Sequence, residues 1–192
     1  MFRSRAYVLV LLAGCKDPPS KAVPPAQAAA ATVVVKDGAG TTLAELRPGH
    51  PCRATIGPQE LIVGGPPLLA MLGTTKWTGI DEPNGTVLVR DTERIARVFP
   101  VGDASNGAVF DLHGIAQARV TVTGQTATVE NKASIPVRKL TRAGETITSS
   151  DPALTITGTD DLILAALLSA PELLPEVRML AACERVLVKG LK

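Results

Sequence analysis

Residues 111–131 read DLHGIAQARVTVTGQTATVEN, and this stretch decides the fold. It contains two β-prone runs, residues 115–123 and 126–129, between Asp111 and Asn131. Asp and Asn suit turns because their side chains bond nearby backbone amides and tolerate unusual φ angles. The stretch therefore predicts strands of an antiparallel sheet joined through turns.

The same arrangement recurs at intervals of twenty residues, at Asp91, Asp111, Asn131 and Asp151. The extended runs that precede these residues are 87–90, 108–110, 126–129 and 146–148, and those that follow them are 95–99, 115–123, 135–140 and 154–157. A fixed period of this length predicts consecutive hairpins. We expect a mainly β fold, an antiparallel meander of repeated hairpins, with one aliphatic face per strand and one rich in Thr, Arg and Gln.

Earlier in the chain, two more hairpins are expected. The runs 32–36 and 41–46 surround the Gly-rich turn 37–40, and the runs 52–56 and 60–63 surround a second turn. Residues 68–72, before Gly73, read as one helical turn or as an apolar loop.

The pattern becomes helical at residues 159–192. Thr159 is expected to cap a short helix over residues 162–168, with two acids in its first turn. That helix is apolar all round, so we expect it to be buried or pressed on the sheet. After Pro175, apolar residues recur at helical spacing on one face, which includes Cys183, while Arg178 and Arg185 fall on the opposite side.

Cys52 and Cys183 are expected to form a disulfide. The N-terminal residues 1–14 have the features of an export signal. An exported chain folds in an oxidising compartment, where disulfides persist. The bridge would join the first part of the sheet to the last helix. Two buried, unpaired thiols are the alternative.

The N-terminus has the features of a signal peptide. Arg3 and Arg5 give a positive start, and residues 6–13 form an unbroken apolar run. This run is far shorter than the roughly 20 residues that span a bilayer as a helix.

The end of this segment, Leu12-Ala13-Gly14-Cys15, resembles the lipobox of bacterial lipoproteins. The resemblance implies cleavage after Gly14, diacylglycerol on the Cys15 sulfur and acylation of the new amine. Two or three acyl chains give a stable anchor. Lys16 in place of Asp implies the outer membrane, facing the periplasm. An ordinary secretory signal with an incidental Cys15 is the alternative.

The chain thus divides into a signal peptide (1–14), a lipidated cysteine with a Pro/Ala-rich tether (15–31), a β-hairpin domain (32–158) and a C-terminal helical segment packed on it (159–192). Pro-Pro pairs hold the tether extended, as a spacer from the membrane. A partner-binding Pro-rich motif is the sharper alternative for the tether.

Composition makes several functions unfavourable. Removing Arg3 and Arg5 with the signal leaves 18 Lys and Arg against 18 Asp and Glu, so the mature chain has no basic excess for nucleic acid. Trp77, Phe99 and Phe110 are its only aromatic residues, too few for the stacking that nucleobase and carbohydrate sites commonly use.

Catalytic and metal-binding signals are weak. The sequence has no Gly-x-Ser-x-Gly elbow, phosphate loop, His-Glu-x-x-His or Cys-x-x-Cys. His50 and His113 read as solvated turn residues, with a shared zinc site as the alternative. Cys52 beside His50 is the remaining nucleophile candidate. The turn acids offer one oxygen ligand each, where a calcium loop supplies several.

We therefore expect no catalytic residue, no cofactor and no metal. The expected function is a membrane-anchored envelope lipoprotein that acts as a non-catalytic binding or scaffolding module, with a possible envelope protein as partner. The alternative is a carrier or sensor of an apolar ligand, held between the helices and the sheet. An enzyme is the third possibility.

Overall fold

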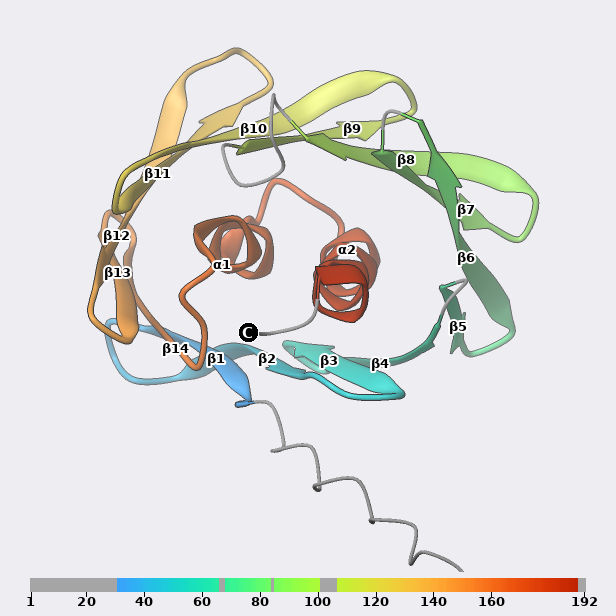
Figure 1. Ribbon diagram of the computed structural model, residues 1–192, viewed down its shortest axis with the longest axis horizontal. Helices are drawn as coiled ribbons and strands as arrows, with labels where there is room; N and C mark the ends of the chain where they lie inside the picture. The colour runs from blue at the N-terminus through green and yellow to red at the C-terminus, as the bar shows by residue number, and fades with distance from the viewer. Residues whose placement is uncertain (1–30, 66–67, 84, 101–106, 190–192) are drawn as a thin grey trace, which may run out of the picture.

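The computed structural model describes residues 31–65, 68–83, 85–100 and 107–189. Within these residues, fourteen antiparallel strands pair in chain order, and the last pairs with the first, so the sheet closes into a barrel (Figure 1). The strands are β1 (Val33–Asp37), β2 (Thr42–Arg47), β3 (Cys52–Ile56), β4 (Gln59–Gly64), β5 (Leu69–Leu72), β6 (Thr75–Glu82), β7 (Gly85–Arg90), β8 (Glu93–Pro100), β9 (Gly107–Leu112), β10 (Ile115–Thr123), β11 (Thr126–Asn131), β12 (Pro136–Ala143), β13 (Thr146–Ser150) and β14 (Ala153–Thr157). Two helices follow, α1 (Leu162–Ser169) and α2 (Pro175–Lys189).

The predicted hairpin meander is confirmed, and its twenty-residue period has a simple origin. One unit is two strands and two turns, so equivalent turns return to the same end of the barrel. The side chains of Asp37 and Asn131 stabilise these turns by accepting hydrogen bonds from the backbone of the turn. Asp37 Oδ1 accepts hydrogen bonds from the backbone N–H groups of Ala39 and Thr41, at 2.9 and 2.8 Å, and Asn131 Oδ1 accepts from those of Ala133 and Ile135.

The barrel closes where β1 pairs with β14, in a register that sets Val35 opposite Ile156. Gly158 follows β14 with a φ of +81°, and a Cβ there would lie 2.0 Å from the backbone oxygen of Thr32. Only glycine permits both this conformation and this approach. The residue is therefore a requirement of closure.

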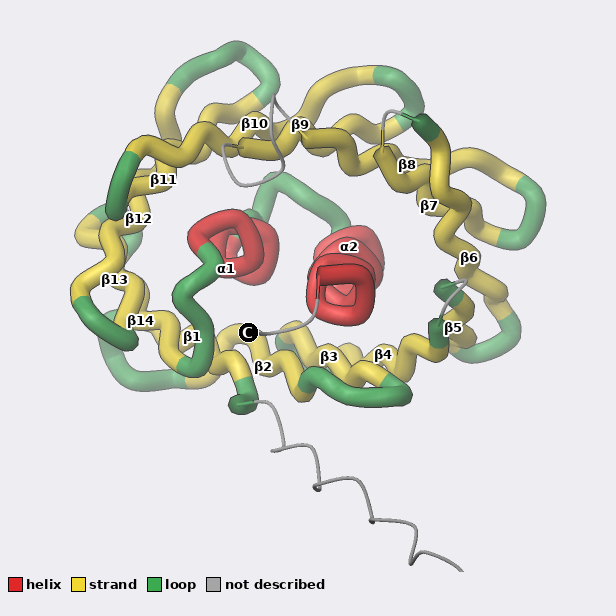
Figure 2. Tube along the Cα trace, viewed as in Figure 1, coloured by secondary structure: helices red, strands yellow, loops and turns green. Residues whose placement is uncertain are grey.

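Both helices lie inside the barrel (Figures 1 and 2). Eight strands enclose a space that side chains alone fill, whereas sixteen to eighteen leave a channel. Fourteen strands therefore enclose more space than their own side chains fill, and the helices occupy it. All eight residues of α1 are buried, as the apolar run over residues 162–168 predicts.

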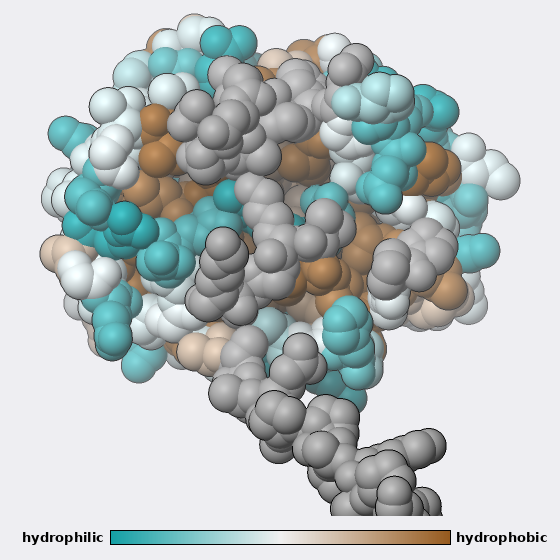
Figure 3. Space-filling model, viewed as in Figure 1, coloured by the Kyte–Doolittle hydropathy of each residue, from teal (hydrophilic) through white to brown (hydrophobic). Residues whose placement is uncertain are grey.

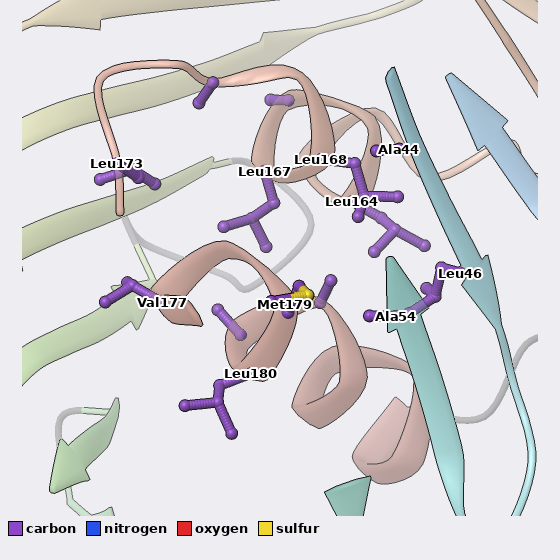
Figure 4. Close-up of a cluster of buried hydrophobic side chains, with 14 of the residues drawn as sticks. Ala44, Leu46, Ala54, Leu164, Leu167, Leu168, Leu173, Val177, Met179 and Leu180 are labelled. Atoms are coloured by element: carbon purple, nitrogen blue, oxygen red, sulfur yellow. The ribbon is translucent and has the colours of Figure 1, made fainter. Parts of the chain in front are cut away.

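The helices and the wall pack through aliphatic side chains. Figure 4 shows Leu164, Leu167 and Leu168 of α1 and Met179 of α2 gathered near Leu46 of the wall. These five side chains are at most 1% exposed. Looking into the barrel, brown apolar residues lie within the ring and teal and white residues cover most of its rim (Figure 3).

Two expectations were wrong. Residues 69–72 form β5, neither a helical turn nor a loop. Asp161 caps α1, in place of Thr159, and no acid lies in the first turn.

The two arginines expected on the side of α2 opposite its apolar face are not on a solvent surface. Arg178 is buried, at 9% exposed, and Arg185 lies against Asp161, because α2 sits inside the barrel.

Candidate functional site

The predicted disulfide is present, and it removes the thiol candidate. Cys52 of β3 and Cys183 of α2 are bonded to each other, and both are fully buried. Cys52 therefore cannot act as a nucleophile with His50 in this oxidised form. Cys15, the predicted lipidation site, lies outside the described residues.

The structure does not bring the two histidines together. His50 precedes β3 and His113 follows β9, and both are exposed. The strand directions place these two turns at opposite ends of the barrel, so a zinc site that uses both is not formed. Among the described residues, no group of three or more His, Cys, Asp or Glu side chains is arranged to hold a metal ion.

The outer wall carries one feature that the sequence analysis missed. Of the eight large apolar side chains exposed among the described residues, four lie on the adjacent strands β4, β5 and β6. We call Ile62, Leu69, Met71 and Ile80 the wall patch. They are 43, 46, 53 and 42% exposed, respectively.

Strand register places these side chains on one surface. Val63 pairs with Ala70 and Gly64 with Leu69, and the inward residues Leu61, Val63 and Ala70 are buried. Because successive side chains alternate between faces, Ile62, Leu69 and Met71 point outward together. On β6, Ile80 pairs with Val87 of β7, which extends the apolar surface by one strand.

A hollow of about 370 Å³ adjoins the wall patch, lined by residues of β7, β8, β9 and the β9–β10 turn. Its apolar floor includes Val87 and Ile95, which are 2% exposed. Its polar lining comprises Arg94, Arg97, Asp111 and His113. Val87 belongs to the hollow and is also the partner of Ile80, so the hollow and the wall patch form one continuous surface.

One carboxylate orders the arginines of the hollow. Glu82 at the end of β6 forms two ion pairs. Its Oε1 lies 2.8 Å from Nη1 of Arg94, and its Oε2 lies 3.5 Å from Nη2 of Arg97. On the other side of the hollow, His113 Nδ1 lies 4.0 Å from Glu93. These exposed pairs contribute little to stability but fix donors beside an apolar surface. The surface therefore places paired polar groups of both signs beside an apolar floor.

A sequence signal for this surface exists. On a strand with one solvated face, apolar and polar residues alternate. The runs 61–63, 69–72 and 87–89 are apolar at every position, so both faces of β4, β5 and β7 are apolar there. That pattern reads equally well as a helix or a buried loop, which is why residues 68–72 were misassigned.

No protein-family model, curated protein or solved structure matches the chain. Neither described helix is both long enough and apolar enough to cross a bilayer. Over its described residues, the chain forms a closed, fourteen-stranded antiparallel barrel with a helical hairpin inside it.

Proposed function

We propose that this protein is a lipid-anchored lipoprotein of the cell envelope that serves as a non-catalytic binding or scaffolding module, and that it docks an envelope protein through the wall patch and the adjoining hollow. The observation that carries the proposal is the wall patch, because clustered exposed aliphatic side chains mark interaction sites more often than scattered ones. The other exposed large apolar residues of the described chain lie apart in sequence: Leu43 on β2, Ile115 on β10, Ile135 before β12 and Leu174 before α2.

The wall patch and the hollow have the parts of a protein–protein interface. Such interfaces have an apolar centre and a polar rim, with arginine enriched. Here the wall patch supplies the centre, and Arg94, Arg97 and His113 supply part of the rim. Glu82 and Asp111 lie beside these cations, so a partner that presents aliphatic side chains ringed by polar and charged groups of both signs would match both.

The barrel that presents this surface is braced from inside by α2. The disulfide joins α2 to β3, and Thr86 of β7 donates a hydrogen bond to Glu184 of α2 at 2.7 Å. These contacts hold α2 against the wall at two separate strands. A surface held in place before binding loses little conformational freedom on binding, which favours affinity.

The proposed location, anchored at a membrane of the cell envelope, supports the same function. Acylation at Cys15 would hold the chain at the membrane. An extended tether over residues 15–31 would let the barrel reach about 50 Å from it. A tethered barrel would meet envelope proteins at a high effective concentration.

The test is site-specific photo-cross-linking in living cells. A photoreactive residue replaces Met71 in the full chain, and its matched control replaces Thr141, an exposed outward residue on β12, seven strands away around the barrel. We expect a discrete cross-linked protein from position 71 and none from position 141. Leu69→Glu should abolish that product while leaving the amount of folded protein unchanged.

Equal cross-linking from both positions, or a product that survives Leu69→Glu, would contradict docking at the wall patch. A product from position 141 alone would place the partner on another face of the barrel.

The alternative, a carrier of an apolar ligand, is favoured by one observation. Most buried residues of the inner wall and the helices are apolar, yet Nε and Nη1 of Arg138 lie buried there without a hydrogen-bond partner. Lipid that stays bound through purification and is detected by native mass spectrometry would support a carrier. Repeated absence would count against it.

A further inference from the structure

Arg138 is a buried cation without adequate partners. It points inward from β12, next to Leu140 on the same face, and is 5% exposed. Its Nε and Nη1 atoms are buried without a hydrogen-bond partner. Burying a charged group costs free energy unless the group is paired and hydrogen-bonded. An acceptor bound to Nε and Nη1 of Arg138 would therefore lower the free energy of the folded protein.

A second buried arginine lies near it. Arg178 of α2 donates from Nε to the Leu167 carbonyl oxygen at 3.3 Å and from Nη2 to that of Leu168. Those carbonyls end α1, where the helix dipole is negative, so Arg178 is partly compensated. Burial and then repulsion from Arg138 lower the pKa of Arg178 to about 10.

One carboxylate belongs to the same cluster. Glu172, in the connection between α1 and α2, opposes the lowering of the pKa of both arginines. No ion pair within 4.0 Å joins it to either arginine in the described part of the chain, and its Oε2 atom is itself buried without a partner. The cluster therefore carries two positive charges and one negative charge, with unused hydrogen-bonding groups of both kinds.

The strand directions locate the cluster at one end of the barrel. Arg138 lies near the start of β12, just after the β11–β12 connection. The connection between α1 and α2 lies at that same end of the barrel. At the opposite end Arg142, also on β12, contacts Asp160 before α1 begins.

We propose that Arg138, supported by Arg178, forms a binding site for a singly charged anion inside this end of the barrel, with a carboxylate group as the best-matched ligand. Guanidinium and carboxylate groups make short, charge-assisted hydrogen bonds. The ligand would balance the excess positive charge and satisfy the Arg138 donors that Glu172 leaves unused. A free small acid and the head group of an apolar acid share this chemistry.

The first test is the thermal unfolding of the full oxidised chain during titration with sodium acetate. We expect a saturable rise in Tm that is lost in Arg138→Met. Arg119→Met is the matched control, since Arg119 is an exposed, outward arginine on β10, two strands away from β12 in the same barrel. General salt effects act on both variants alike, so the difference between them reports the site.

The second test separates binding from a purely structural role. Glu172→Gln removes the competing negative charge and should increase acetate affinity by about tenfold, which corresponds to a modest electrostatic term. If Arg138 and Glu172 are simply a structural ion pair, Glu172→Gln lowers stability and brings no gain in acetate affinity. That result would overturn the proposal.

Crystals soaked in sodium bromide give a direct readout, because bromide scatters anomalously. An anomalous peak beside Arg138 Nε or Nη1 supports the site. No peak there, with Glu172 bonded directly to Arg138, refutes it even if Arg138→Met fails to fold.

Sodium laurate distinguishes the two sources of the ligand. Laurate that competes with acetate and depends on Arg138 identifies the head group of an apolar acid. Acetate binding without laurate binding identifies a free small anion.

Discussion

Arg185 of α2 bonds to the carboxylate of Asp161, the same carboxylate that caps α1. Arg185 donates from Nε to Oδ2 and from Nη2 to Oδ1, the latter at 2.9 Å. Asp161 Oδ1 also accepts the backbone N–H groups of Ile163 and Leu164, at 2.9 and 3.1 Å. One side chain thus starts the first helix and holds the second beside it.

Replacing Asp161 with Ala should lower the free energy of unfolding by about 2–4 kcal/mol. The lost cap accounts for about 1 kcal/mol. The rest comes from leaving Arg185, whose side chain is 13% exposed, without its carboxylate. Urea unfolding measures the change.

Asp160→Ala is the matched control for that variant. The Asp160 side chain is 79% exposed and lies 3.6 Å from Arg142, so its removal should cost less than about 0.5 kcal/mol. Equal effects of the two variants would show that the cap and the buried pair contribute nothing special.

Reducing the disulfide should lower the free energy of unfolding by about 4–5 kcal/mol. Cys52 and Cys183 are separated by 131 residues, and in the chain-entropy model a longer closed loop gives a larger effect. The measurement is urea unfolding with and without dithiothreitol. The double variant Cys52→Ala/Cys183→Ala should not respond to the reductant. An unchanged midpoint for the wild-type chain would mean that the bridge does not stabilise the fold.

The hairpins were predictable because their signals are local. Asp91 and Asn131 mark turns, and alternating residues on β10 to β14 mark one buried face. The closure of the barrel by β1 and β14 was not predictable. Nothing in the sequence around Val35 or Ile156 indicates that these two residues pair across the sheet. A run of hairpins can form an open sheet, a sandwich or a barrel with the same local pattern.

The helices show the same limit. The apolar run over residues 162–168 predicted the burial of α1. The pattern of α2 predicted an apolar face with Arg178 on the opposite side, but it could not predict that Arg178 is buried as well, because the surrounding wall is not visible in the local sequence. The wall patch was missed for a related reason. Leu69 and Met71 are apolar residues on an outward face, and no local rule distinguishes them from core residues.

Replacing Gly158 with Ala should destabilise the barrel by about 2 kcal/mol or more. The residue needs a positive φ, and a Cβ would overlap the Thr32 carbonyl, so the β1–β14 seam has to shift. Hydrogen exchange of the β1 and β14 amides should accelerate before that of β10 and β11. Gly124→Ala, at a φ of +58° but with no atom near the added Cβ, is the matched control and isolates the conformational cost. Equal losses for the two variants would remove the steric part of the argument.

The full chain extracted from membranes should lack its first fourteen residues and carry acyl chains on Cys15. The basis is the resemblance of residues 12–15 to a lipobox, together with the short apolar run before them. Each buried CH₂ contributes about 0.8 kcal/mol, so two or three chains hold the protein at the membrane, whereas one would release it. Intact mass spectrometry measures both changes at once. Cys15→Ser is the control and should remove the acyl mass. An unacylated wild-type Cys15 on an otherwise processed chain would mean that the barrel is exported without an anchor, and the docking partner would then have to be sought among secreted or periplasmic proteins.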